Sequence, residues 1–192
     1  MTEQQIALFA STAQTLIGNL AEIAIEEQAE YDPAESITGE SGEGKSVLCI
    51  GGRGAIDDAA ASMIAQVLLV QGATVSQAGH TAVSAGTFHL PRLTDIDTVI
   101  IAFLNASSKA HARQAVRRLK RHKPSVRVGI MMTGVEGTSK TPLTAEDIDA
   151  DFVVSTISDA VRDALTTAEA VGVKTIKRPG RSREPKTTPL VA

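Results

Sequence analysis

The residues best suited to bind a ligand are Gly51, Gly52, Arg53 and Gly54, which follow the apolar run at residues 47–50. Glycine tolerates positive φ and lets a ligand approach the backbone, and the planar Arg53 guanidinium suits a carboxylate or a phosphate. An alanine-rich amphipathic stretch comes next. This order predicts a buried strand, a glycine turn and a packed helix, with the turn at the strand end where open α/β sheets bind ligands.

The same turn also has a purely structural interpretation. Asp57 and Asp58 fall in the first turn of the helix that follows, where their negative charges interact favourably with the positive end of the helix dipole. The same charges would repel an anion that settled there. A tight strand-to-helix turn with a capping Asp would need no ligand, so the two interpretations stay open.

Small polar residues follow the other expected strands, and they fit either a ligand crevice or helix caps. The sequence does not distinguish between these two roles. The candidates are Asn105, Ser107, Thr133, Gly134 and Ser155.

No catalytic or metal-binding group is predicted. Residues 39–46, GESGEGKS, match the phosphate-loop pattern, but a polar linker precedes them and a strand follows, whereas a phosphate loop needs a strand before it and a helix after it. The four His residues lack metal-ligand spacing, and no Ser lies in a nucleophile elbow. The sequence therefore favours a protein without enzymatic activity.

Charge is distributed unevenly along the chain. Residues 1–44 hold nine acidic residues and no Lys or Arg, and the remaining residues carry all 19 basic side chains. Seven of these lie in residues 109–123, KAHARQAVRRLKRHK. Four of them recur at i+4 spacing and form a basic stripe, in which like charges repel one another. Such a stripe favours binding of an anionic partner; the alternative is a solvated outer helix. The stripe consists of Lys109, Arg113, Arg117 and Arg121.

The anionic partner would be a lipid surface, the acidic leader or nucleic acid, and the shortage of aromatic residues argues against nucleic acid. The single Cys49, inside an expected strand, indicates a core residue in a reducing compartment. No membrane span or signal peptide is visible. We expect a cytoplasmic location, with the inner face of the membrane as an alternative.

Residues 1–30 are predicted to form an amphipathic helix that either docks on the globular domain or pairs in a homodimer. An acidic linker spans residues 31–46, and residues 173–192 form a Pro-rich basic tail that we expect to be disordered. The predicted helical seam consists of Ile6, Phe9, Ala13, Leu16, Leu20 and Ile23.

Between linker and tail, residues 47–172 alternate short apolar runs with amphipathic stretches. This alternation predicts a flavodoxin-like α/β domain with an open five-stranded parallel sheet. Strands are expected at 47–50, 74–77, 98–104, 126–132 and 152–155, and helices at 57–70, 107–122, 145–148 and 158–171. Ser107 or Ser108 should cap the second of these helices, Thr144 the third and Ser158 the last.

Part of the chain resembles the soluble C-terminal domain of bacterial permeases of the autoinducer-2 exporter family. The resemblance rests on residues 47–54 and 57–61, on Arg117-x-Leu119 with Pro124, and on the Ser155-x-x-Ser158-x-Ala160-Val161 stretch. It implies that the chain is the water-soluble cytoplasmic part of a transporter, or a stand-alone relative of that part, with a role in regulation or interaction and not in catalysis.

That domain in turn is similar to the cobalamin-binding fold, whose cobalt-ligating members carry D-x-H-x-x-G after the first strand. Residues 53–60 read RGAIDDAA, without a His, and Met131-Met132-Thr133-Gly134 stands where a Gly-Gly is usual. The resemblance therefore implies a retained scaffold without the cofactor, so no cofactor is expected.

We therefore predict a non-catalytic regulatory, ligand-sensing or interaction domain in which Arg53 and its glycines hold an anionic ligand. Two alternatives remain. One is a small enzyme, or a binder of a cobalamin-type or nucleotide-type ligand, that uses the crevice at the strand ends. The other is a dimeric scaffold held together by residues 3–29.

Overall fold

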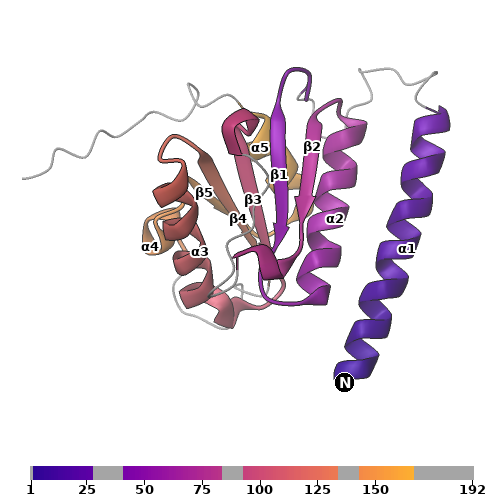
Figure 1. Ribbon diagram of the computed structural model, residues 1–192, viewed down its shortest axis with the longest axis horizontal. Coiled ribbons are helices and arrows are strands. Elements are labelled where there is room, and N and C mark those ends of the chain that lie inside the picture. The colour runs from indigo at the N-terminus through magenta and orange to yellow at the C-terminus, as the bar shows by residue number, and fades with distance from the viewer. Residues whose placement is uncertain (1, 28–40, 84–92, 134–142, 167–192) are drawn as a thin grey trace, which may run out of the picture.

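The computed structural model describes residues 2–27, 41–83, 93–133 and 143–166. Their centre is one five-stranded sheet in the order β2-β1-β3-β4-β5, with every neighbouring pair parallel (Figure 1). This confirms the predicted open α/β architecture and its flavodoxin-like strand order. The strands are β1 (Ser46–Gly51), β2 (Thr74–Ala78), β3 (Thr98–Phe103), β4 (Arg127–Met132) and β5 (Phe152–Val154).

Helices cover both faces of the sheet because each parallel connection must cross over it. Helices α2 (Ala55–Val70) and α5 (Ile157–Leu165) pack on one face, and α3 (Lys109–His122) and α4 (Ala145–Ile148) pack on the other. The described connections also contain three short 3-10 turns, η2 (His80–Val83), η3 (Leu93–Asp95) and η4 (Ala106–Ser108).

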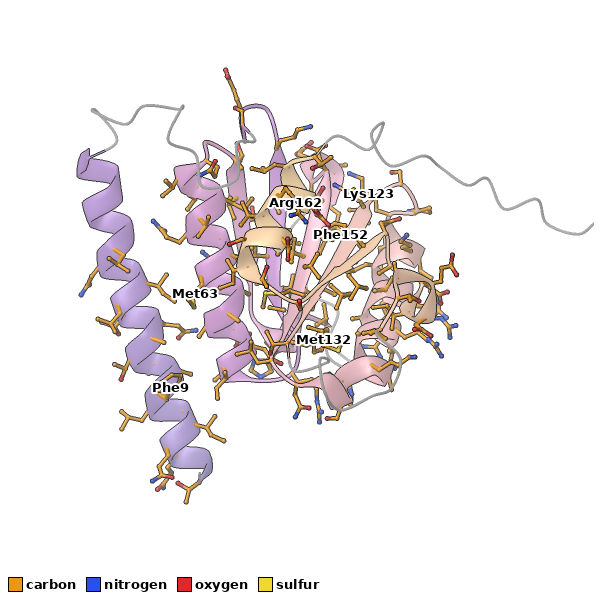
Figure 2. All side chains as sticks on the ribbon, turned by 180° about the vertical axis from the view of Figure 1, so that it is seen from behind. Phe9, Met63, Lys123, Met132, Phe152 and Arg162 are labelled. Carbon is orange, nitrogen blue, oxygen red and sulfur yellow. The ribbon has the colours of Figure 1, made fainter. Side chains whose placement is uncertain are left out.

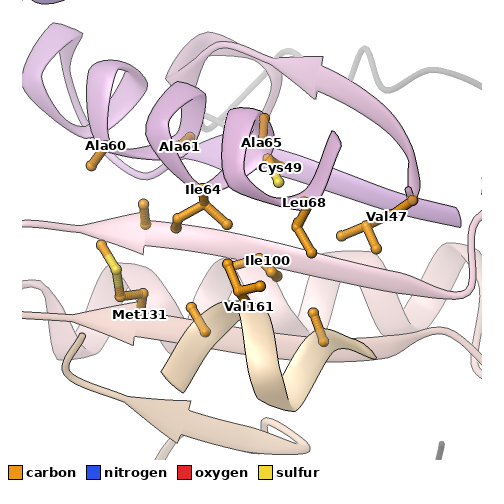
Figure 3. Packing of buried hydrophobic residues seen from close by; sticks show 14 of the residues in the cluster. Val47, Cys49, Ala60, Ala61, Ile64, Ala65, Leu68, Ile100, Met131 and Val161 are labelled. Carbon is orange, nitrogen blue, oxygen red and sulfur yellow. The ribbon is translucent and has the colours of Figure 1, made fainter. Parts of the chain in front are cut away.

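The core consists of two apolar layers on either side of the sheet, and β3 is buried along its whole length. Side chains alternate between the layers, as the pleat requires. Cys49 and Ile100 join Ile64 and Leu68 of α2 in one layer (Figure 3). Ile64 and Leu68 are fully buried, and burial of a side chain of this kind stabilises by about 1.5–3 kcal/mol.

The N-terminal helix α1 (Glu3–Glu27) packs against the outer side of α2, which confirms docking on the globular domain (Figure 1). The predicted seam is partly wrong, because Phe9, Leu16 and Leu20 are 58–61% exposed. Ala10 is only 1% exposed, since its small side chain lets the helices approach closely. The face toward α2 consists of Ile6, Ala10, Ala13 and Ile17.

One predicted cap is wrong, and another is correct in position but lacks the expected hydrogen bond. Thr156, not Ser158, caps α5 by accepting the Asp159 backbone N–H at 3.1 Å, and its hydroxyl holds the pKa of Asp159 below the usual value. At α3, Ser108 stands at the N-cap position as predicted, but its side chain makes no capping hydrogen bond; Asn105 caps the preceding turn η4 by accepting the Ser107 N–H at 2.9 Å.

Thr144 caps α4 as predicted, in a capping box with Asp147. Helix α5 ends at Leu165 because Thr166 takes an extended conformation, so it is shorter than predicted. The predicted tail at residues 173–192 and most of the linker lie outside the described residues. Within the described parts of the chain, no helix combines the length and apolarity that a membrane crossing needs.

Cys49 should be chemically inert in the folded protein. Burial raises the pKa of its thiol to about 12, and the thiolate is the reactive form. We expect no reaction with Ellman's reagent at pH 8 and one reactive thiol per chain in guanidinium chloride. Rapid titration of the native protein would contradict this packing of β1.

Candidate functional site

The glycine turn lies at the carboxyl end of β1, as predicted, but Gly51 and Gly52 serve close packing rather than positive φ, whereas a Cβ on Gly54 would meet no atom within 4 Å. Among the described glycines, only Gly44 and Gly72 have positive φ. The Gly52 N–H donates to the carbonyl oxygen of Ala102 at 2.9 Å. A Cβ on Gly52 would overlap the Phe103 ring and lie 2.8 Å from that same oxygen. The turn is therefore pressed against the end of β3.

Asp57 fixes this arrangement. One carboxylate oxygen accepts the Arg53 backbone N–H at 2.8 Å, and the other accepts the Leu104 backbone N–H at 2.9 Å. The residue is only 8% exposed. Asp57 thus joins the β1–α2 turn to the residue that follows β3, which supports the structural interpretation of this carboxylate and satisfies two amides at once.

The same place is the switch point of the sheet. The connection from β1 runs through α2 on one face, and the connection from β3 runs through α3 on the other. In open α/β sheets, ligands bind in the crevice that opens between two such strands. Arg53 follows one of these two strands, and Asn105 and Ser107 follow the other; all three are exposed.

Two polar side chains at this edge have no partner among the described residues. The Arg53 side chain is exposed and makes no hydrogen bond or ion pair there. Ser108, at the amino end of α3, is 1% exposed, and its hydroxyl has no hydrogen-bond partner. A buried hydroxyl without a partner is uncommon and calls for an explanation, and a ligand at this edge is one.

The structure adds an acid–base pair that the sequence did not indicate. Asp58 accepts the His80 backbone N–H at 2.6 Å, and its second oxygen lies 2.6 Å from His80 Nδ1. The two side chains are 17% and 33% exposed. The carboxylate fits only because Gly51 lacks a Cβ, which would overlap it. Twenty-two positions separate the two residues, so no local spacing could have identified them.

The other candidates lie at increasing distance from the switch point. The Thr133 N–H donates to the Phe103 carbonyl oxygen at 3.0 Å, so Thr133 adjoins the end of β3. Ser155 follows the edge strand β5, and both β3 and β4 separate it from β1. Gly134 lies outside the described residues.

The basic stripe of α3 is largely paired within the chain. Lys109 Nζ lies 3.0 Å from an Asp147 oxygen, and Arg117 Nε lies 3.0 Å from Asp149. Arg113 donates to the Asp147 carbonyl oxygen. The pKa of Asp147 is lowered first by the Thr144 backbone N–H and then by Lys109. Of the stripe, only Arg121 stays exposed without a partner in the part of the chain that the structure describes.

A cavity of about 340 Å³ lies at the opposite edge of the sheet, beside the amino ends of the strands. Its cations hold the fold together. Lys123 Nζ donates to three carbonyl oxygens at 2.7–3.0 Å, and Arg127 donates to two, one of them at Thr166. Lys45 also lines this cavity and is followed directly by β1. No helix follows residues 39–46, so the phosphate-loop match is wrong in context, as expected.

Comparisons with known proteins show no family for this chain. No family model matches, and no curated protein matches. Five solved chains are similar in structure. Among them is the 1.5 Å crystal structure of a novel cobalamin-binding protein from Desulfitobacterium hafniense DCB-2. It is 14% identical, covers 83% of this chain and 86% of its own, and has a TM-score of 0.46. The resemblance to autoinducer-2 exporters stays a prediction.

The turn after β1 does not fit a cobalt-ligating loop of the D-x-H-x-x-G kind. Residues 51–56 contain no His, and the side chain of Asp57 is committed to two backbone amides. The histidine at this edge, His80, follows β2 instead and bonds Asp58 through Nδ1. We therefore derive no chemistry through cobalamin.

Replacing Asp57 with Ala should destabilise the fold. It leaves the Arg53 and Leu104 amides without their acceptor, and the cost reaches about 1–3 kcal/mol for each amide that water does not reach. Urea unfolding measures the loss. The matched control Asp57→Asn keeps one carbonyl oxygen and should lose less. Equal stability of wild type and Asp57→Ala would contradict the role of this carboxylate.

Proposed function

We propose that this protein is a non-catalytic, ligand-sensing domain that holds a small anionic molecule over the carboxyl ends of β1 and β3. The supporting observation is the exposed Arg53 guanidinium, which has no partner among the described residues and lies at the switch point of the sheet. Its backbone is fixed by Asp57, so the side chain projects from a rigid base. A bidentate guanidinium contact is the recognition mode that carboxylates and phosphates favour.

Local electrostatics are compatible with an anion despite two neighbouring carboxylates. The charge of Asp57 is directed into two backbone N–H groups, and the charge of Asp58 is directed toward the His80 ring and backbone. Arg53 has no such internal partner among the residues described. The repulsion expected from an Asp-Asp pair at this helix start is therefore reduced where a ligand would contact Arg53.

A finer proposal is that the domain is the regulatory part of a membrane transporter, in the cytoplasm at the inner face of the membrane. Its support is the sequence resemblance to exporter domains. Contact with an anionic membrane surface through Lys109, Arg113, Arg117 and Arg121 belongs to the same proposal. The ion pairs of α3 with Asp147 and Asp149 weaken this part of the proposal, because they neutralise charge that a lipid surface would need.

A thermal-shift screen with nucleotides, sugar phosphates and cobalamins tests the ligand site. We expect at least one phosphorylated compound to raise the melting temperature, and we expect Arg53→Ala to lose that shift because the guanidinium is gone. Arg121→Ala, an exposed Arg at the far end of α3, should keep it. A shift that survives in Arg53→Ala, or no shift with any compound, would contradict the proposed site.

The Asp58–His80 pair supports a second candidate, a small enzyme acting at the same edge. With Nδ1 held by the carboxylate, Nε2 of His80 is left for proton transfer, the arrangement in which a carboxylate orients a general base. A panel of p-nitrophenyl esters and phosphates tests this. Turnover that is lost in His80→Gln and kept in His122→Gln would favour the enzyme. No turnover with wild type would contradict it.

A further inference from the structure

Helix α1 uses only part of its apolar surface to bind the globular domain. The face formed by Ile6, Ala10, Ala13 and Ile17 lies against α2. About 70° further around the helix lies a second row of large apolar residues. We call Phe9, Leu16 and Leu20, which are 61%, 58% and 60% exposed, the outer stripe.

The outer stripe exposes three large apolar side chains to solvent on one face of α1. Leu8 is also 70% exposed, and on the neighbouring α2 Met63 and Leu69 are 44% and 41% exposed. Figure 2 shows Phe9 on α1 and Met63 on α2. A row of large apolar side chains exposed along one face of a helix is typical of a binding face. We propose that a second copy of this chain covers the outer stripe, with the two α1 helices antiparallel.

The spacing of the stripe fits an antiparallel copy of itself. Together with the half-buried Ala13 at its border, the stripe is spaced by four, three and four residues, and this spacing is identical when the helix is reversed. An antiparallel second copy therefore places Phe9 opposite Leu20 and Ala13 opposite Leu16 along the whole contact. Large side chains then meet large ones at the ends, and the smallest meets a leucine near the centre.

The charges of α1 also favour a second copy of this chain in the antiparallel orientation. Helix α1 carries four Glu and no basic residue, and three of the Glu lie near its carboxyl end, where the helix dipole is already negative. Parallel copies would bring the two sets of three together. Antiparallel copies put each set beside the positive amino end of the other helix. An anionic membrane surface, by contrast, would repel all four carboxylates.

Sedimentation of the full chain tests the association. We expect wild type at micromolar concentration to sediment with twice the 20.1 kDa chain mass. Leu16→Glu should be monomeric because it places a charge in the stripe, whereas Gln14→Glu, the same charge on an exposed position outside the stripe, should stay dimeric. Circular dichroism checks that both variants are folded. A monomeric wild type, or a dimer that tolerates Leu16→Glu, would overturn the proposal.

Disulfide trapping tests the orientation, and the buried Cys49 can remain in place. In the antiparallel pair, position 9 lies opposite position 20 and roughly 16 Å along the axis from its own copy. A disulfide needs Cα atoms within about 7 Å. Phe9→Cys and Leu20→Cys should therefore crosslink only when mixed. Crosslinking of either variant alone would show parallel helices and overturn this arrangement, as would a mixture that forms no disulfide.

Discussion

The candidate site depends on the two hydrogen bonds that the Asp57 carboxylate accepts. Its two oxygens accept one amide from the glycine turn after β1 and one amide from the residue after β3. These two segments are distant in sequence and leave the sheet toward opposite faces. The pairing of β1 with β3 and the Gly52 hydrogen bond to Ala102 hold them together up to the strand ends, and beyond the ends a side chain has to link the turn to Leu104. A nearly buried carboxylate with two N–H donors does so, and it does so at the point where the sheet changes direction.

The two hydrogen bonds of Asp57 determine which side chains at the carboxyl edge of the sheet are available to a ligand. With its backbone fixed, Arg53 projects outward, and the neighbouring Asp58 is occupied by His80. The opposite edge has a larger number of cations, but Lys123 and Arg127 donate to backbone carbonyl oxygens there. Burial also lowers the pKa of Arg127, an effect that Asp163 and Asp151 oppose. A ligand site is therefore better supported at the carboxyl edge, where a cation remains available.

The sequence predicts the fold well because the fold depends on local patterns. The unbroken apolar run of β3 and the glycine turn before α2 are visible in the chain itself. The site is predicted less well because its contacts join distant residues: Asp57 bonds an amide 47 positions away, and Asp58 bonds a histidine 22 positions away. The same limit explains the basic helix, whose partners Asp147 and Asp149 come from another element. For α1, the spacing could not decide between two adjacent apolar faces, and the small Ala10 selected one of them.

The most direct test of the anion site is a titration of the ¹⁵N-labelled protein with inorganic pyrophosphate, followed by NMR. Pyrophosphate is a simple probe of anion binding, and every backbone amide reports separately. An anion site at the switch point predicts saturable shifts that cluster at residues 52–54 and 105–108, which follow β1 and β3. Shifts that cluster around Lys45, Lys123 and Arg127 at the other edge would contradict it, as would no saturable shift at residues 52–54.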